Sequence, residues 1–437
     1  MAHTVLIAGG GFAGAGAARA LERALPLQST RLLLVNDVNF LLYTPLLPEA
    51  AAGTLEPRHV VTPLRDVLKR TFLRIGAVSS HDPARRTVTI SSHEGDSEEV
   101  TYDQLLLAAG SVSRSLPIPG LSEHAIGFKS LADAIWIRNH MIETLEAANA
   151  TADADLRREQ LTYVFVGGGY SGLEALAELQ DFAADTIQAY PLARLTGIRF
   201  MLVEAGDAVL PEIPPELGEY SLRELRGRGI DIRLGTSLNS MSKDSVELST
   251  GERIPTRTVV WTAGVVAHPS MSSMGIELDQ KGRIPVDDHL RVAGLPGVYA
   301  AGDCAAVPDP DGGLCPPTAQ HAIRQGQVAA ANMAAGLGLG QSKSFTYRSR
   351  GSFVNLGRHK AVASARGITL SGFPAWWAAR TYHVAQMPGA ARRLRAVVDW
   401  TVGLPFGRDS AETGTIGHPH PLKAEVYAGG GSHRPVP

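Results

Sequence analysis

The chain has 437 residues, with 41 Lys and Arg against 43 Asp and Glu, 44% hydrophobic residues and a formal net charge of −2. At about 150 residues per domain this length predicts two or three domains, and the composition excludes a disordered chain and argues against a dedicated nucleic-acid-binding protein. Only two cysteines occur, Cys304 and Cys315, so neither a disulfide framework nor a four-cysteine metal site can form, and a reducing, cytosolic compartment fits best.

The first 35 residues have the pattern of a strand, a tight turn, a helix and a second strand. The apolar run 4–8 leads into Gly9-Gly10-Gly11-Phe12-Ala13-Gly14, an alanine-rich stretch to about Leu25 and the apolar run 32–35. This order predicts a βαβ dinucleotide-binding unit. Gly9 permits the turn, Gly11 lets a pyrophosphate approach the backbone, and Gly14 lets the helix pack close to the sheet.

The same plan recurs near residue 163. The apolar run 163–166 precedes Gly167-Gly168-Gly169-Tyr170-Ser171-Gly172, and a helical stretch leads to the run 200–203 and Glu204. One such motif is weak evidence, whereas two copies, each between a predicted strand and helix, strongly indicate two nucleotide sites. Glu204 is placed to accept hydrogen bonds from an adenosine ribose and to repel a 2′-phosphate, which favours NADH over NADPH.

Three further apolar runs end in small or acidic residues. Runs 102–110 and 258–264 both end in Ala-Gly, and run 298–303 ends in Gly302 and Asp303, where a carboxylate can meet a ribityl hydroxyl. No Lys or Arg precedes the N-terminal apolar run, and the other uncharged windows are rich in Gly, Ala or Ser or are interrupted by Pro. We therefore expect neither a signal peptide nor a transmembrane helix.

Residues 348–408 differ from the rest of the chain. They hold ten Lys and Arg with one acid, Asp399, and three of the five tryptophans, Trp376, Trp377 and Trp400. Basic residues interleaved with aromatic ones are typical of segments that bind an anionic membrane surface. A helical subdomain that packs its tryptophans internally explains the same composition, and both interpretations stay open. Nucleic-acid binding is a third, less favoured alternative, because no binding motif accompanies the charge.

The order of these motifs resembles the two-dinucleotide-binding-domain flavoprotein superfamily, with FAD on the first unit and NAD(P)H on the second. Residues 39–49 with Gly53, residues 167–174 and residues 317–326 are similar to segments of type II NADH dehydrogenases, the single-subunit NADH:quinone oxidoreductases that do not pump protons. The resemblance runs from residue 4 to about 408. It implies hydride transfer from NADH to FAD and then reduction of a membrane quinone, with no metal.

The resemblance implies an α/β fold of two Rossmann-like domains with a C-terminal membrane-associating segment. We expect the FAD-binding domain at 1–115 and 270–345, the NADH-binding domain at 116–269, a membrane-facing segment at 346–408 and a flexible tail at 409–437. The family also implies peripheral attachment to an anionic membrane at the cytoplasmic face of the cell membrane, which makes the membrane interpretation of 348–408 the favoured one. No nucleic-acid partner is expected, and a homodimer is left open.

The resemblance implies catalytic roles for Glu174, Gln320 and Arg324. The expected cofactor-binding residues combine both glycine turns with the ends of the neighbouring strands: Gly9, Gly11, Phe12, Ala13, Gly14, Asn36, Asp37, Val78, Ala109, Gly110, Gly167, Gly169, Tyr170, Ser171, Gly172, Glu204, Gly264, Gly302, Asp303 and Ala319. Glu174 is expected near nicotinamide and flavin, although an acid in the first turn of a helix, complementing the dipole, is the simpler alternative.

The chain departs from the family pattern at several positions. Arg324 replaces a motif glutamine, with Gln325 beside it, which leaves the identity of the electron acceptor in doubt. Asn36, followed by Asp37, replaces the acid that usually ends the second strand. On the predicted helix 375–387, Trp376, Arg380, His383 and Met387 share one face, which suits either a quinone channel mouth or packing on the flavin domain.

Four other functions compete with this interpretation. Sulfide:quinone reductases and disulfide reductases need paired redox cysteines, and no cysteine occurs before Cys304. A reductase of a small electron-carrier protein stays open. A slow flavoprotein redox sensor is a further alternative, and rapid NADH oxidation with a quinone acceptor would separate these classes.

Overall fold

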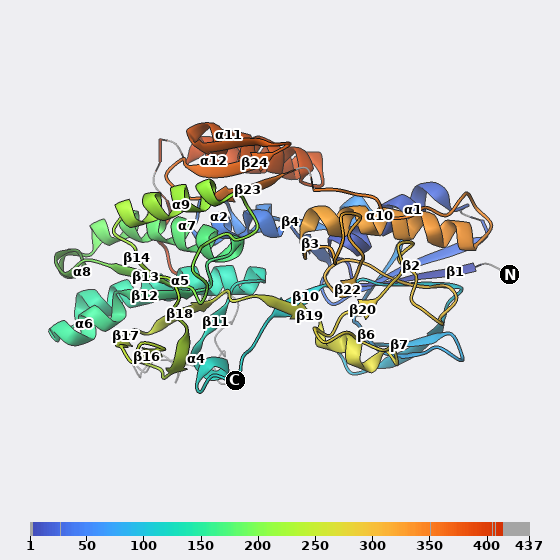
Figure 1. The fold of residues 1–437 in the computed structure, drawn as a ribbon, viewed down its shortest axis with the longest axis horizontal. Coiled ribbons are helices and arrows are strands. Elements are labelled where there is room, and N and C mark those ends of the chain that lie inside the picture. The colour runs from blue at the N-terminus through green and yellow to red at the C-terminus, as the bar shows by residue number, and fades with distance from the viewer. Residues whose placement is uncertain (1–2, 27, 350, 404, 407, 414–437) are drawn as a thin grey trace, which may run out of the picture.

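The computed structural model describes residues 3–26, 28–349, 351–403, 405–406 and 408–413. The predicted flexible tail spans residues 409–437, and its part from residue 414 onward lies outside the described residues. Two α/β lobes lie side by side, and the C-terminal segment covers one side of the molecule above them (Figure 1). The fold therefore has the two Rossmann-like units that the repeated glycine motif predicts.

The sheet of the first lobe is parallel, in the strand order β21-β9-β1-β2-β5. Its central strand carries a run of four buried apolar residues, as expected for a strand covered on both faces. Helices α1 and α10 lie together over this sheet (Figure 1). The elements are β1 (His3–Ala8), α1 (Phe12–Ala24), β2 (Thr30–Asn36), β5 (Phe72–Ile75), β9 (Gln104–Leu107), β21 (Val298–Ala300) and α10 (Ala319–Gly336).

The sheet of the second lobe repeats this topology in the order β11-β18-β12-β13-β14. Its strands are β11 (Ile126–Gly127), β12 (Thr162–Val166), β13 (Arg199–Val203), β14 (Asp231–Arg233) and β18 (Thr258–Trp261). The helices of this lobe are α4 (Leu121–His124), α5 (Leu131–Ala150), α6 (Ala154–Gln160), α7 (Tyr170–Thr186), α8 (Pro191–Thr196) and α9 (Pro215–Gly227), with the 3-10 turn η3 (Ile187–Ala189). Strand β12 is buried throughout, whereas β1 in the first lobe is buried over its last four residues.

Smaller sheets flank the two large ones, in the orders β6-β7-β8, β3-β4, β20-β22 and β15-β16-β17. Their strands are β3 (Phe40–Leu42), β4 (Val61–Pro63), β6 (Ala77–Asp82), β7 (Thr87–Ser91), β8 (Ser97–Thr101), β15 (Leu238–Met241), β16 (Ser245–Leu248), β17 (Arg253–Pro255), β20 (Ile284–Pro285) and β22 (Ala305–Ala306). The short helical elements are η1 (Thr44–Leu46), α2 (Leu47–Ala51), η2 (Pro57–His59), α3 (Leu64–Val67) and η4 (Pro269–Ser273).

Two features connect the lobes. Strands β10 (Ser111–Ser113) and β19 (Val265–Ala267) form an antiparallel pair between them (Figure 1). Helix α2 comes from the N-terminal part of the chain, yet its apolar residues share a buried cluster with α5 and α7 of the second lobe. Residues of the first chain segment therefore reach the side of the second glycine-turn helix.

The C-terminal segment is a small sheet with two helices. Strands β23 (Ser352–Asn355), β24 (Ala361–Ala365) and β25 (Ile368–Gly372) precede α11 (Phe373–Gln386) and α12 (Ala390–Val402). Helix α11 packs on β24, and β23 lies against α7 of the second lobe. Among the residues that the structure describes, no helix is both long enough and apolar enough to cross a bilayer.

Candidate functional site

The first glycine turn matches its expected geometry. Gly9 has φ +109°, and a Cβ built on it would collide with the carbonyl of Ala108, while a Cβ on Gly14 would collide with the Gly9 carbonyl. Apart from its two neighbours in the chain, no described residue has an atom within 4 Å of the Cβ position of Gly11. The backbone is therefore tight where the helix meets the strand and open where a pyrophosphate would approach.

The second turn repeats this geometry. Gly167 has φ +114° and lies against Thr262, and a Cβ on Gly172 would collide with the Gly167 carbonyl. Around Gly169, as around Gly11, no described residue other than the two chain neighbours has an atom within 4 Å of the Cβ position. Each turn begins a helix, so its N-terminal amides and dipole face the open position, and both turns fit a dinucleotide pyrophosphate.

The residues that end the second strand of each unit bind the turn itself. Asn36 Oδ1 accepts from the Gly10 amide at 2.6 Å. In the second unit, Glu204 Oε2 accepts from the Gly168 amide at 2.5 Å and Oε1 accepts from Gly206 at 2.7 Å. The sequence indicated a ribose contact for these side chains and missed the backbone contact. Asp37 is exposed beside the first turn, and Val78 is buried on β6.

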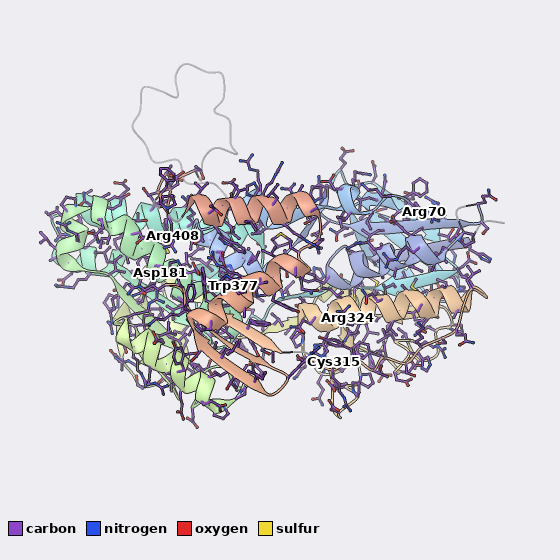
Figure 2. All side chains as sticks on the ribbon, turned by 90° about the horizontal axis from the view of Figure 1, so that it is seen from above. Arg70, Asp181, Cys315, Arg324, Trp377 and Arg408 are labelled. Atoms are coloured by element: carbon purple, nitrogen blue, oxygen red, sulfur yellow. The ribbon has the colours of Figure 1, made fainter. Side chains whose placement is uncertain are left out.

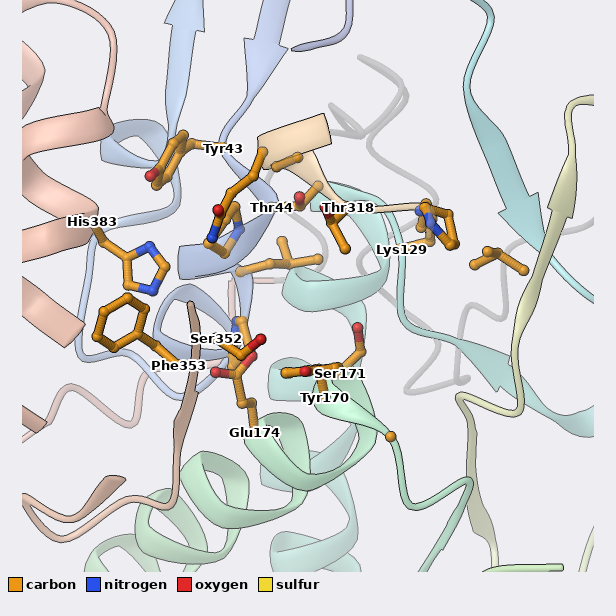
Figure 3. A pocket seen from close by; sticks show the side chains of 18 of the residues that line it. Tyr43, Thr44, Lys129, Tyr170, Ser171, Glu174, Thr318, Ser352, Phe353 and His383 are labelled. Atoms are coloured by element: carbon orange, nitrogen blue, oxygen red, sulfur yellow. The ribbon is translucent and has the colours of Figure 1, made fainter. Parts of the chain in front are cut away.

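A cavity of about 410 Å³ brings together residues of the second turn, α10 and the C-terminal segment. Figure 3 shows Glu174, Tyr170 and Ser171 on one side of it, with Tyr43, His383 and Phe353 on another. The predicted site residues that line it are Gly169, Tyr170, Ser171, Glu174, Gly264, Ala319, Gln320 and Arg324. The other predicted residues lie outside this lining, many of them at the two glycine turns.

Gln320 is held by two contacts in this cavity. Its Nε2 donates to the Gly351 carbonyl at 3.0 Å, and its Oε1 accepts from the Tyr347 hydroxyl at 2.8 Å. The guanidinium of Arg324 lies 5.7 Å from the centre of the Tyr347 ring and donates to Gln327 at 3.3 Å. Tyr347 thus connects two predicted residues, and no sequence motif indicated it.

Asp303 and its neighbours join the two lobes near β10. Ser111 donates to Asp303 Oδ2 at 2.6 Å, and Lys129 Nζ lies 3.7 Å from the same oxygen. Gly302 has φ +79°, and its amide donates to Gln325 Oε1 at 2.8 Å. Gln325, beside the unusual Arg324, therefore fixes the loop that carries Asp303.

Glu174 lies within reach of this cavity and is not a helix-capping acid. It is the fifth residue of α7, which has no acid in its first turn, so the dipole alternative is wrong. Its Oε1 accepts from the Asn355 amide at 2.9 Å. Burial, opposed by that amide and reinforced by Glu49 and Glu178, raises the pKa of Glu174 to about 8.

Two further carboxylates lie beside Glu174. Glu178 and Glu49 are 3% and 4% exposed, and Asn355 Nδ2 donates to both, at 2.8 Å and 3.4 Å. Burial and the neighbouring Glu49 raise the pKa of Glu178 to about 7. Glu49 ends one of the recognised motifs, but only the fold brings it from α2 to α7. Spacing along α7 was the available signal for Glu178.

The predicted helix 375–387 has a divided role. Trp376 and Arg380 pack inward, and the Arg380 guanidinium lies 4.2 Å and 4.4 Å from the ring centres of Trp376 and Trp400. Met387 is fully buried. These residues support the packing interpretation, whereas His383 lines the cavity, where burial lowers its pKa to about 4 and keeps the imidazole neutral.

Both cysteines are free and buried. Burial is the largest influence on each thiol and raises the pKa of Cys304 and of Cys315 to about 11. Neither is a thiolate at neutral pH, so they do not form the nucleophilic pair of a disulfide reductase.

Two parallel Rossmann-like units, each with an open glycine turn, define a nucleotide-dependent oxidoreductase class. The chain belongs to the pyridine nucleotide-disulphide oxidoreductase family, whose model matches residues 3–326. Within it, the chain is 32% identical to a probable NADH dehydrogenase of Dictyostelium discoideum, covering 86% of this chain and 84% of the relative. It is 30% identical to the type II NADH:quinone oxidoreductase Ndh of Mycobacterium tuberculosis, in an alignment that covers 92% of this chain and 88% of the relative.

Solved structures share the fold. NDH2 from Plasmodium falciparum, solved in complex with NADH, has a TM-score of 0.86 at 17% identity and covers 94% of this chain and 100% of its own. A ferredoxin reductase from Rhodopseudomonas palustris has a TM-score of 0.66 at 24% identity, and the match covers 82% of this chain and 81% of the reductase. The resemblance to type II NADH dehydrogenases is confirmed by the curated relatives, and the larger structural coverage includes the C-terminal segment.

Proposed function

We propose that the protein is an FAD-dependent NADH:quinone oxidoreductase that does not pump protons. The observation that carries the proposal is the shared cavity, in which the second glycine turn and Glu174 face Ala319, Gln320 and Arg324. A site for hydride transfer must hold the nicotinamide side and the flavin side in contact. The relatives named as NADH:quinone oxidoreductases support the same activity.

We assign FAD to the unit formed by residues 1–115 and 270–345, and NADH to residues 116–269. FAD, when bound, supplies the two-electron chemistry, so no metal or thiol is required. Gly9, Gly11 and Gly14 would hold its pyrophosphate, and Asp303 would meet its ribityl chain. Glu204 would meet the ribose of NADH, and its charge disfavours NADPH.

The cavity side chains orient and protonate the acceptor in this proposal. Gln320, fixed by Gly351 and Tyr347, offers an amide to a quinone carbonyl. Arg324 adds a positive charge, which favours an acceptor that becomes anionic as it is reduced. Glu174, with its raised pKa, holds a proton near neutral pH at the wall of the cavity.

The C-terminal segment is the proposed membrane surface. Among the described residues, nine of the seventeen exposed large hydrophobic side chains lie between residues 368 and 406: Ile368, Leu370, Phe373, Trp377, Leu394, Val397, Val398, Val402 and Phe406. Trp376 and Trp400 pack on Arg380, whereas Trp377 is 62% exposed on the C-terminal segment, where Figure 2 labels it. This surface suits peripheral attachment at the cytoplasmic face of the cell membrane.

Vesicle binding tests the membrane surface. Replacing Arg392, Arg393 and Arg395 by Gln should weaken binding to anionic vesicles about 100-fold, since each basic side chain near such a surface contributes about 1 kcal/mol. NADH oxidation with a soluble acceptor should stay intact. Replacing the exposed Arg19, Arg23 and Arg31 of the first lobe is the matched control. Unchanged sedimentation of the C-terminal triple variant with vesicles would show that this cluster does not bind membranes.

Stopped-flow absorbance tests the activity itself. The yellow protein is mixed anaerobically with NADH and then with a water-soluble ubiquinone or menaquinone analogue. Bleaching by NADH and fast reoxidation by the quinone are the expected results. Bleaching without reoxidation by quinone would instead indicate a carrier-protein reductase or a slow redox sensor, and Arg324 would then be the first residue to examine.

A further inference from the structure

Three carboxylates from two distant chain segments meet at Asn355. The backbone amide of Asn355 donates to Glu174, and its side-chain amide donates to both Glu178 and Glu49. Asn355 Nδ2 is therefore a donor that Glu178 and Glu49 share, which places their two carboxyl groups next to each other. Burying Glu49 and Glu178 beside a third acid is costly unless the carboxyl groups carry protons or have charged partners.

A small cavity separates Glu49 from Glu174. It holds about 10 Å³, the size of a single water, and its lining includes Glu49, Glu174, Arg380 and His383. Within the part of the chain that the structure describes, Arg380 Nε and His383 Nδ1 are buried without a hydrogen-bond partner. A site of that size with a donor, an imidazole nitrogen and two carboxylates has the polar partners that a buried water needs.

The other end of the cluster faces a larger cavity. This cavity, of about 510 Å³, is lined by Thr54, Glu178, Asp185 and Arg408, among others. Arg408 lies 3.6 Å from Glu178 Oε2 and 3.0 Å from Asp185, whose side chain is 61% exposed. Figure 2 shows Arg408 and Asp181 close together beside the C-terminal segment. Glu178 is therefore buried but adjoins a cavity whose rim is in contact with solvent.

We infer that Glu178, Glu49 and a water molecule held by Arg380 and His383 form a proton-uptake route from this outer cavity to Glu174 at the redox cavity. The inference rests on the proposed function. Reduction of a quinone by NADH takes up one proton from solution, because NADH, one proton and quinone give NAD⁺ and quinol. Protons enter at Glu178, pass to Glu49 and through the water to Glu174, and leave on the reduced acceptor.

The charged groups around the route influence the pKa values of its carboxyl groups. Glu178 faces Glu49, Asp181, Arg408 and Arg380, and Glu174 faces Glu49 and Glu178. Glu49 accepts from Arg380 at 3.4 Å and from the Trp400 indole at 2.5 Å. Both carboxylate oxygens of Asp181 already accept hydrogen bonds from Arg228 and Arg358, so Asp181 lies outside the route. The pKa values of Glu174 and Glu178, raised to about 8 and about 7, let both carboxyl groups bind and release protons near neutral pH, which suits proton transfer.

The pH profile of quinone turnover tests the route. In Glu178→Gln and Glu49→Gln, kcat with a saturating quinone should fall at least 10-fold at about pH 8 and less at about pH 6. Flavin bleaching by NADH and turnover with ferricyanide, which takes no proton, should stay within about two-fold of wild type. A pH indicator in weak buffer should show proton uptake slowed together with reoxidation.

Matched variants separate proton transfer from structure. Glu178→Asp keeps a titratable group and should recover most of the activity, and imidazole should rescue Glu178→Gln by delivering protons. Glu219→Gln, an exposed acid on α9, is the control. Equal losses in bleaching and reoxidation at every pH, or wild-type quinone turnover in both Gln variants, would overturn the route. A wild-type protein that bleaches with NADH but does not reduce quinone would overturn the proposed function as well.

Discussion

The two glycine-turn helices have the same beginning and different uses. Counting from the third glycine, Glu174 of α7 corresponds to Gly16 of α1, and Glu178 corresponds to Ala20. A Cβ on Gly16 would lie 3.5 Å from the carbonyl of Ile323, so α1 uses this position to pack against α10. Helix α7 instead presents acids to α2 and β23. The same motif is therefore followed by a helix packed on α10 in the first lobe and by a helix that carries two acids towards α2 and β23 in the second.

The largest effects are expected from substitutions that disrupt one glycine turn at a time. Gly14→Ala places a methyl group against the Gly9 carbonyl and should yield protein without bound FAD, which absorbance near the flavin bands measures. Gly172→Ala has the same collision at Gly167 and should keep its yellow colour. Its bleaching by NADH should be at least 100-fold slower, equivalent to about 2.7 kcal/mol. Loss of FAD from both variants would show that the lobes do not bind their nucleotides independently.

Glu204→Gln sharpens the comparison at the strand ends. The amide oxygen can still accept from Gly168, as Asn36 does from Gly10, while the negative charge is removed. The preference for NADH over NADPH should fall about 10-fold or more, read as the ratio of kcat/KM for the two nucleotides. A ratio equal to that of wild type would mean that Glu204 only stabilises the turn and does not select between the two nucleotides.

Glu174→Gln should change how stability depends on pH. The folded-state pKa of about 8 lies above the ordinary value of 4.5, so the contribution of Glu174 is fully present below about pH 4.5 and is lost as pH rises through 8. The variant should therefore gain in Tm over wild type as the pH increases, by of order 5 °C near pH 9. A Tm difference that is constant from about pH 5 to about pH 9 would contradict the buried-acid description.

Asn36→Asp is the smallest expected effect. An aspartate restores the acid usual for the family and keeps an oxygen for the Gly10 amide. FAD content should change less than about two-fold, and the pH dependence of FAD retention should be similar to that of wild type, since the side chain is only partly buried. Clear loss of FAD would show that the first turn depends on a neutral acceptor.

The sequence indicated what is local and missed what the fold assembles. The glycine turns and their flanking strands were predictable because each depends on neighbouring residues, and both sheets follow from them. Asn355 binds acids that lie more than 170 residues earlier in the chain, and Tyr347 binds Gln320, 27 residues earlier. No sequence pattern predicts such contacts. Lys129 likewise meets Asp303 across the lobes.

The basic, aromatic segment shows the same limit. Its composition allowed both membrane binding and internal packing, and the structure divides the residues between the two. Trp376 and Trp400 enclose Arg380, whereas Trp377 lies on the outside of the same helix as Trp376. Adjacent residues on a helix point about 100° apart, so composition alone cannot assign them.

The paired strands β10 and β19 make the spacing between the two nucleotide sites a property of the backbone. Ser111 lies opposite Ala267 and Ser113 opposite Val265, so the outgoing and returning chains are hydrogen-bonded to each other as they pass between the lobes. Two coupled crossings resist twisting and stretching far better than a single flexible linker. Substitutions in the outer parts of either lobe should therefore leave the distance between the proposed flavin and nicotinamide sites unchanged.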